Sequence, residues 1–172
     1  MGSSSDLKEA RRAPGSEWLK NHPRFLERVY LITKKALAVS YPLLNRVAPR
    51  LTKRVMVWSE EVLKGYAFNC QMCGQCILHS TGMTCPMNCP KNLRNGPCGG
   101  VRIDGNCEVI PDMPCVWVQA WERSKNMSHY ADDIQNLQPP VNRTLQNTSA
   151  WINLFEKHEL EGLEGWRAAE RK

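Results

Sequence analysis

The sequence predicts an α-helical protein with a large irregular part, on three observations. Apolar residues recur with a helical period before residue 65, all eight cysteines of the 172-residue chain fall between Cys70 and Cys115, and Pro139-Pro140 opens a polar run. We expect N-terminal helices, a loop-rich eight-cysteine domain with a small β-hairpin, and an extended C-terminal tail with a helix. The expected segments are a mobile tail (1–15), a basic helical arm (16–65), a cysteine-rich domain (66–127) and a partner-wrapping tail (128–172).

Two amphipathic helices account for the basic arm, after a short turn that Ser16 can cap. Pro23 suits the first position of a helix, and Pro42 is expected to end or kink that helix. Its apolar stripe consists of Phe25, Val29, Ile32, Ala36 and Val39. A second helix is expected from about Arg50 to Lys64, ended by Gly65. Its stripe consists of Leu51, Val55, Trp58 and Val62. Both stripes suit a core or an interface.

The formal net charge of +6 is concentrated in the arm. Residues 1–65 hold 13 Lys and Arg against 6 Asp and Glu, a net +7, whereas residues 66–127 hold 5 against 4 and residues 128–172 hold 5 against 7. A basic arm suits a solvated helix face, an acidic partner protein or an anionic membrane surface. Nucleic acid is disfavoured because the cysteine segment is nearly neutral. No apolar stretch is long enough to span a bilayer, so membrane contact would be peripheral.

The eight cysteines supply enough thiolates for two four-ligand metal sites. The first three read Cys-x2-Cys-x2-Cys, the run with which bacterial ferredoxins offer thiolates to one cubane. We therefore expect a metal-cluster domain with two [4Fe–4S] clusters. Cys70, Cys73 and Cys76 should share one cluster, which Cys85 or Cys115 completes. The full set of expected metal ligands is Cys70, Cys73, Cys76, Cys85, Cys89, Cys98, Cys107 and Cys115.

Three alternatives compete with this interpretation of the cysteine segment. Disulfides need an oxidising compartment, and the first residues contain no apolar run of a secretory signal, so we expect a cytoplasmic protein without disulfides. Zinc is the stronger alternative, either as two Zn sites or as one Zn beside one [4Fe–4S] cluster, because closed four-cysteine sites would also use all eight thiols. His79 lies inside the cysteine segment and is a further candidate ligand.

Two short elements are expected within and after the cysteine loops. Residues 99–110 read as a β-hairpin with Asp104-Gly105 at its turn, a dipeptide typical of two-residue hairpin turns. A helix is expected from about Cys115 to Asn126. Trp117 and Trp121, four residues apart, would share one face of it and pack over the metal sites.

Five blocks of the cysteine segment are distinctive. They read Phe-Asn-Cys-Gln-Met-Cys-Gly-Gln-Cys (68–76), Thr-Cys-Pro-Met-Asn-Cys-Pro-Lys (84–91), Asn-Gly-Pro-Cys-Gly-Gly (95–100), Gly-Asn-Cys-Glu-Val (105–109) and Cys-Val-Trp (115–117). Together they resemble the methylenetetrahydrofolate reductase C-terminal domain family, over roughly residues 60–125. The resemblance implies a small iron–sulfur subunit, or in some proposals a zinc subunit, with all eight cysteines as ligands. It also implies a flavin-containing catalytic subunit as partner, with FAD, that converts 5,10-methylenetetrahydrofolate to 5-methyltetrahydrofolate.

Two functions follow from these expectations. The first is a non-catalytic electron-transfer subunit, which passes electrons between a further electron-donor protein and the FAD of the catalytic subunit. The second is a structural or assembly subunit, whose iron–sulfur or zinc sites brace the flavoprotein. No catalytic residue is expected, because the four histidines are dispersed and no nucleophile–base pair accompanies them. The arm and a C-terminal helix capped by Ser149 are expected to hold the partner, with Trp58, Trp151 and Phe155 or their neighbours at the interface.

Overall fold

The computed structural model describes residues 21–96 and 98–156. Within this part the chain forms four α-helices, α3 (Pro23–Val47), α4 (Pro49–Phe68), α5 (Val116–Ser124) and α6 (Ala150–Glu156). Four single 3-10 turns lie between them, η1 (Leu78–Thr81), η2 (Pro86–Asn88), η3 (Asp132–Gln135) and η4 (Arg143–Leu145). The α-helical and irregular class is confirmed. The expected tail at 1–15, the turn after Ser16 and the stretch after Glu156 lie outside the described residues.

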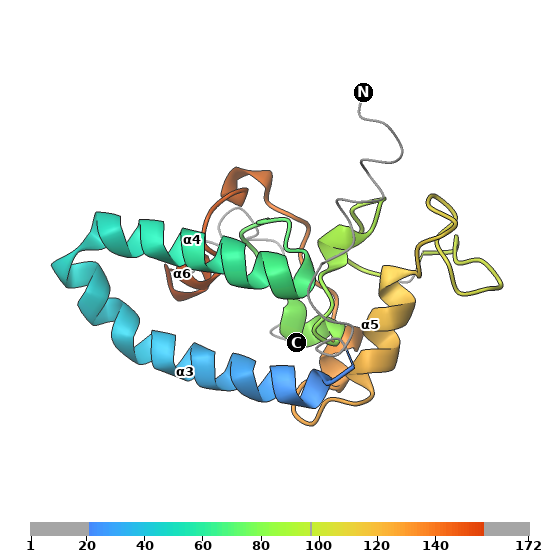
Figure 1. The fold of residues 1–172 in the computed structure, drawn as a ribbon, viewed down its shortest axis with the longest axis horizontal. Helices are drawn as coiled ribbons and strands as arrows, with labels where there is room; N and C mark the ends of the chain where they lie inside the picture. Colours follow the sequence, from blue (N-terminus) through green and yellow to red (C-terminus); the bar gives the residue numbers. More distant parts are fainter. Residues whose placement is uncertain (1–20, 97, 157–172) are drawn as a thin grey trace, which may run out of the picture.

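Helices α3 and α4 form a hairpin joined by one residue, Ala48 (Figure 1). Ala48 takes an extended φ of −144° because the proline that follows disfavours helical backbone at the preceding residue. Of the two expectations for Pro42, that it would end or kink α3, the first was wrong, since the helix runs on to Val47. A proline inside a helix removes one backbone hydrogen bond, and burial of the neighbouring Tyr41 side chain helps to hold the helix together there.

Helix α4 also runs further than the sequence indicated. Gly65 lies inside the helix, which ends at Phe68. The residue that ends it is Asn69, whose φ of 51° is left-handed and whose N–H donates to the carbonyl oxygen of Gly65 at 2.9 Å. Asparagine is one of the few residues that adopts this conformation readily. The helix therefore delivers the chain directly to Cys70.

The β-hairpin expected at residues 99–110 is not seen. Gly105 does make a turn, with φ +79° and its N–H donating to Arg102. Only isolated bridges follow, however, one between Val101 and Cys107 and one between Asn106 and Pro114. Pro111 and Pro114 follow the expected second strand and have no N–H to continue a ladder. This region therefore stays a set of loops ahead of α5. Helix α5 itself confirms the expected helix with slightly closer bounds.

Helix α6 packs against both arms of the hairpin (Figure 1). Trp151 and Ile152 of α6 form a buried cluster with Tyr41 of α3 and Met56 of α4. Ser149 precedes α6 and accepts from the N–H of Ile152 at 3.3 Å, as expected for a helix cap. Trp151 was expected at a partner interface. It is buried inside its own chain instead, because α6 packs against both long helices.

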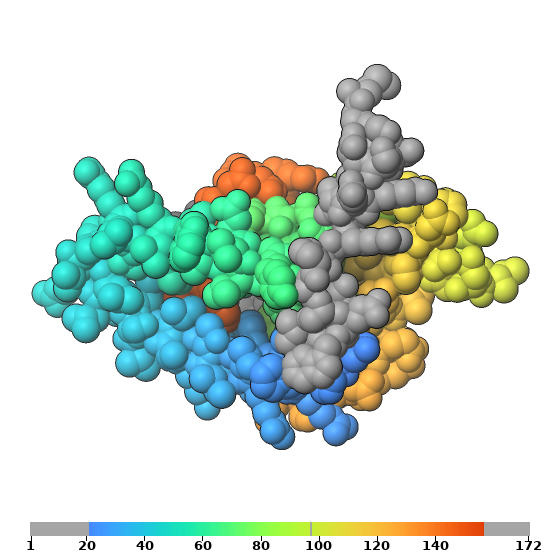
Figure 2. Space-filling view, viewed as in Figure 1, coloured from blue at the N-terminus to red at the C-terminus, as the bar shows by residue number. Residues whose placement is uncertain are grey.

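The apolar stripes of the arm stay on the surface. Every residue of both expected stripes is exposed, from 42 % for Val29 to 82 % for Val39 among the large side chains. The hairpin occupies one whole end of the molecule (Figure 2). The stripes are therefore not part of the core that the described residues form. Within the described part, no helix is long and apolar enough to cross a membrane.

Candidate metal centre

The loop after α4 carries the first three cysteines around a tight curve. Asn69, Met72 and Gly74 all have positive φ, at 51°, 46° and 74°, and left-handed residues turn the chain sharply. Gly74 tolerates no side chain, because a Cβ there would lie 2.2 Å from the carbonyl oxygen of Leu145. As a result the three cysteines of the Cys-x2-Cys-x2-Cys run line one pocket.

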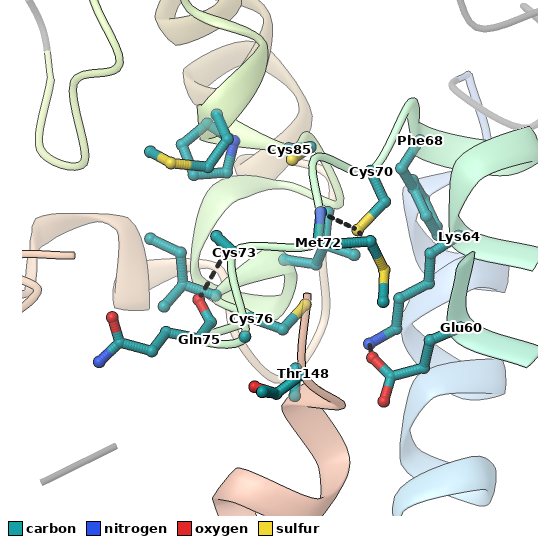
Figure 3. A pocket seen from close by; sticks show the side chains of 16 residues that line it. Glu60, Lys64, Phe68, Cys70, Met72, Cys73, Gln75, Cys76, Cys85 and Thr148 are labelled. Atoms are coloured by element: carbon teal, nitrogen blue, oxygen red, sulfur yellow. Dashed lines mark hydrogen bonds and ion pairs between the residues drawn. The ribbon is translucent and has the colours of Figure 1, made fainter. Parts of the chain in front are cut away.

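Cys85 is the fourth thiol of this pocket (Figure 3). It directly precedes η2, and its charge would interact with those of all three cysteines of the triplet. The space between the lining side chains, open solvent included, is about 420 Å³. Of the two cysteines proposed to complete the triplet, Cys85 lies here, and Cys115 lies elsewhere. We call this group, Cys70, Cys73, Cys76 and Cys85, the four-thiol pocket.

Burial raises the pKa of three of these thiols. Desolvation is the main cause in each case, and it raises the pKa of Cys70 to about 11 and that of Cys85 to about 12. The pKa of Cys76 is raised for the same reason. These thiols therefore keep their protons at neutral pH unless a cation takes their place, because metals bind the thiolate form. The chemistry of this donor set fits a metal or a metal–sulfur cluster.

Comparison with known proteins identifies a family for this chain. A family model described as methylene-tetrahydrofolate reductase C terminal matches residues 49–144, more than half of the chain. The chain belongs to this family. No curated protein and no solved structure matches it. The family region runs from α4 to the start of η4 and contains all eight cysteines, whereas α3 and α6 lie outside it.

The other four cysteines lie in the loops before α5. Cys89 and Cys115 are buried in one cluster with Trp117. Cys107 is buried as well, and Cys98 is half-buried. The ion pair with Glu108 is the main cause that raises the pKa of the exposed Lys91, and the charges of Cys98 and Cys107 add to it. Both thiols therefore lie near the ammonium group of Lys91.

The block Asn-Gly-Pro-Cys-Gly-Gly has a packing reason at its first glycine. A Cβ at Gly96 would lie 2.1 Å from the Trp117 ring, so only glycine allows this approach. The prediction that the tryptophans of α5 pack over the cysteines holds for Trp117, which contacts the Cys89 and Cys115 cluster. It does not hold for Trp121, which is 46 % exposed.

All eight thiols are free. Across residues 21–96 and 98–156, no three His, Cys, Asp or Glu side chains stand in positions to hold one metal ion together. Four of the cysteines line the four-thiol pocket, and the other four lie in the loops before α5. The assignment of all eight as metal ligands stays a prediction.

Two charged residues of the four-thiol pocket were missed from the sequence. Lys64 and Glu60 of α4 both line it, and Lys64 Nζ lies 2.6 Å from Glu60 Oε2. Burial alone would lower the pKa of Lys64, but the charge of Cys76 in its thiolate form and that of Glu60 outweigh burial and raise it. The sequence shows the i,i+4 spacing of Glu60 and Lys64, which is typical of an ion pair on a helix. It does not show that this pair lies beside the cysteines.

His79, the candidate histidine ligand, does not line the four-thiol pocket. Its ring stacks on Tyr30 with centroids 5.4 Å apart and meets Tyr130 edge-on at 5.1 Å. The Tyr30 hydroxyl lies 3.3 Å from His79 Nδ1. Burial lowers the pKa of His79, which favours the neutral ring. These contacts give His79 a place in an aromatic cluster between α3 and η1.

Proposed function

We propose that this chain is a non-catalytic iron–sulfur subunit of a methylenetetrahydrofolate reductase complex. It would pass electrons to or from the flavin of a partner subunit that interconverts 5,10-methylene- and 5-methyltetrahydrofolate. The observation that carries the proposal is the four-thiol pocket, in which a Cys-x2-Cys-x2-Cys loop and a fourth, distant cysteine line the same space. Bound clusters would supply one-electron transfer.

The residues are suited to two four-cysteine clusters. Cys70, Cys73, Cys76 and Cys85 would hold the first cluster, which leaves Cys89, Cys98, Cys107 and Cys115 for the second. The N–H of Met72 donates to Cys70 Sγ at 3.4 Å. Such hydrogen bonds to cysteine sulfurs are one way in which a protein sets the reduction potential of a cluster.

The surface of the α3–α4 hairpin is an argument for a partner protein. Each residue advances about 100° around a helix, so the exposed stripes lie roughly opposite the buried rows that face α6. The two stripes together form the exposed apolar surface of the hairpin. We call this surface the docking face. Its large apolar residues are Phe25, Val29, Ile32, Val39, Leu43, Leu51, Val55, Trp58 and Val62.

The charge beside the docking face is of one sign. Glu27 and Glu60 are buried, so Glu61 is the one exposed acid of α3 and α4, both fully described. The exposed cations of the same helices are Arg24, Arg28, Lys35, Arg46, Arg50, Lys53 and Arg54. An exposed apolar area of this extent marks an interaction site. Its cationic border suits an apolar surface rimmed by acidic residues on the flavin-containing subunit.

The decisive experiment is anaerobic co-expression with the catalytic subunit. The purified complex should contain about eight irons and eight acid-labile sulfides per copy of this chain, if each cubane uses four cysteines. Its visible absorption should bleach with dithionite. In stopped-flow mixing, clusters that have been reduced in advance should then transfer electrons to the FAD of the complex.

Three outcomes would count against the proposal. A colourless complex with two zincs would point to zinc sites that only brace the flavoprotein. Clusters that stay reduced while the FAD of the complex stays oxidised would exclude electron transfer and favour a structural role for the subunit. A complex that forms only on anionic vesicles would assign the docking face to a membrane surface.

A further inference from the structure

Lys64 brings a buried positive charge to the four-thiol pocket (Figure 3). Its side chain is 13 % exposed and lies in the last two turns of α4. The ammonium group also sits 5.1 Å from the centre of the Trp151 ring. A lysine is rarely buried unless it has a partner, and here the direct partner is Glu60.

Glu60 is itself held in place, which fixes the direction of the ion pair. Glu60 Oε2 accepts from Lys64 at 2.6 Å, and Glu60 Oε1 accepts from the hydroxyl of Ser149 and from the N–H of Trp151, the latter at 3.2 Å. The start of α6 thus draws the carboxylate away from the sulfurs. The ammonium group interacts with both Cys70 and Cys76, and at Cys76 its effect is larger than that of Glu60.

The pair is therefore a dipole with its positive end toward the pocket. Charges interact more strongly in a buried site than in water because the effective dielectric constant is lower. One-electron reduction of a thiolate-bound group adds one negative charge and neither makes nor breaks a bond. A fixed ammonium group stabilises that added charge, so it favours the reduced state.

We propose that Lys64 is a built-in counter-charge, which raises the reduction potential of the group held by Cys70, Cys73, Cys76 and Cys85. Glu60 is its positioning residue and partly offsets its charge. This inference rests on the proposed iron–sulfur function. It predicts opposite effects from removing the two ends of the pair, which a merely structural role would not produce.

The test is an anaerobic redox titration of the full chain in its complex, followed by electron paramagnetic resonance, with dithionite as reductant. Lys64→Met should shift the midpoint potential of one cluster to a more negative value and leave the other unchanged. Lys64→Arg, which keeps the charge, should have a midpoint potential close to that of the wild type. Glu60→Gln should move the same cluster to a more positive value. Lys125→Met, whose side chain is exposed just after α5 and outside the docking face, is the control and should change neither potential.

Several results would overturn the inference. They are unchanged potentials in Lys64→Met at full iron content, equal shifts of both clusters, or shifts of the same sign in Lys64→Met and Glu60→Gln. If Lys64→Met loses iron, the direction of the shift in Glu60→Gln still decides the sign.

Failure of the proposed function looks different. Wild-type protein with zinc and no redox signal would end the electron-transfer role. The counter-charge would then be tested by zinc competition with a chelator. Lys64→Met should bind one zinc more weakly and Glu60→Gln more tightly; equal affinities would overturn the counter-charge as well.

Discussion

Glu27 ties the N-terminal helix to the body of the protein, and its removal tests how the fold is held. The side chain is 1 % exposed. Its carboxylate accepts three backbone N–H groups, from Ser128 at 2.8 Å, His129 at 2.8 Å and Tyr130 at 2.9 Å. These bonds join α3 to the loop after α5, about a hundred residues further along the chain. We predict that Glu27→Ala loosens this junction.

The magnitude follows from the hydrogen bonds. Bonds to a charged group contribute about 1.5–3 kcal/mol each, so three would suggest at least ~5 kcal/mol. Ser128 and His129 are exposed in the loop, and water can hydrate their N–H groups after the change. We therefore expect a loss of about 3 kcal/mol in the free energy of unfolding. For a chain of this size that corresponds to a drop of roughly 6–12 °C in Tm.

The pKa of Glu27 adds a test by pH. Burial alone would raise this pKa, but the three backbone hydrogen bonds together lower it below the reference value of 4.5. A lowered pKa means that the ionised form is the one that stabilises the fold. Its contribution is complete above about pH 5 and is lost as the pH falls through the folded-state pKa. The gap in stability between wild type and Glu27→Gln should therefore narrow from pH 7 to pH 4.

The assay is thermal unfolding followed by circular dichroism at 222 nm. Glu61→Gln, on the exposed side of α4, is the matched control and should change Tm little. The reasoning fails if the Tm of Glu27→Ala lies within 2 °C of that of Glu61→Gln. It also fails if the difference in stability between wild type and Glu27→Gln grows as the pH falls.

Three further predictions concern the pocket and the docking face. Cys73→Ser should remove about half of the iron and one of the two cluster signals; loss of both or of neither would contradict the shared assignment. Gly74→Ala should destabilise the chain by about 3 kcal/mol, because its Cβ meets the Leu145 backbone at 2.2 Å where φ is +74°; Gly99→Ala, with open space around it, should change Tm little, and equal Tm values would refute this. Trp58→Ser should weaken binding to the flavin-containing subunit at least tenfold in calorimetry, with Tm unchanged, because Trp58 is 65 % exposed in the free chain. That binding should persist at 0.5 M NaCl, since apolar contacts are screened little; its loss there would favour a purely ionic contact.

The sequence by itself determined the local features. The period of apolar residues placed α3 and α4, the position of Pro23 marked the start of α3, and Ser149 marked the start of α6. The cysteine blocks indicated the family, and the family match over residues 49–144 confirmed it. Such signals depend on neighbours within a few residues, so they can be found along the chain.

Helix ends and the hairpin show where local rules were not enough. Gly65 and Pro42 are both helix breakers by propensity, yet both lie within helices. The breaks fall at Ala48, where the next proline restricts the backbone, and at Asn69, whose φ is positive. A single substitution costs a helix only a few kcal/mol, so packing elsewhere can outweigh it.

Only the tertiary structure decided which residues meet. It placed Cys85 beside the triplet and Cys115 beside Cys89, because closure of the loops between them depends on contacts made far along the chain. It also divided the apolar residues of the arm, since α6 can cover only one side of the hairpin. The row with Tyr41 and Met56 is buried against Trp151, while the more regular stripe with Trp58 stays exposed. Periodicity identifies an apolar face, but what covers that face depends on the shape of the rest of the molecule.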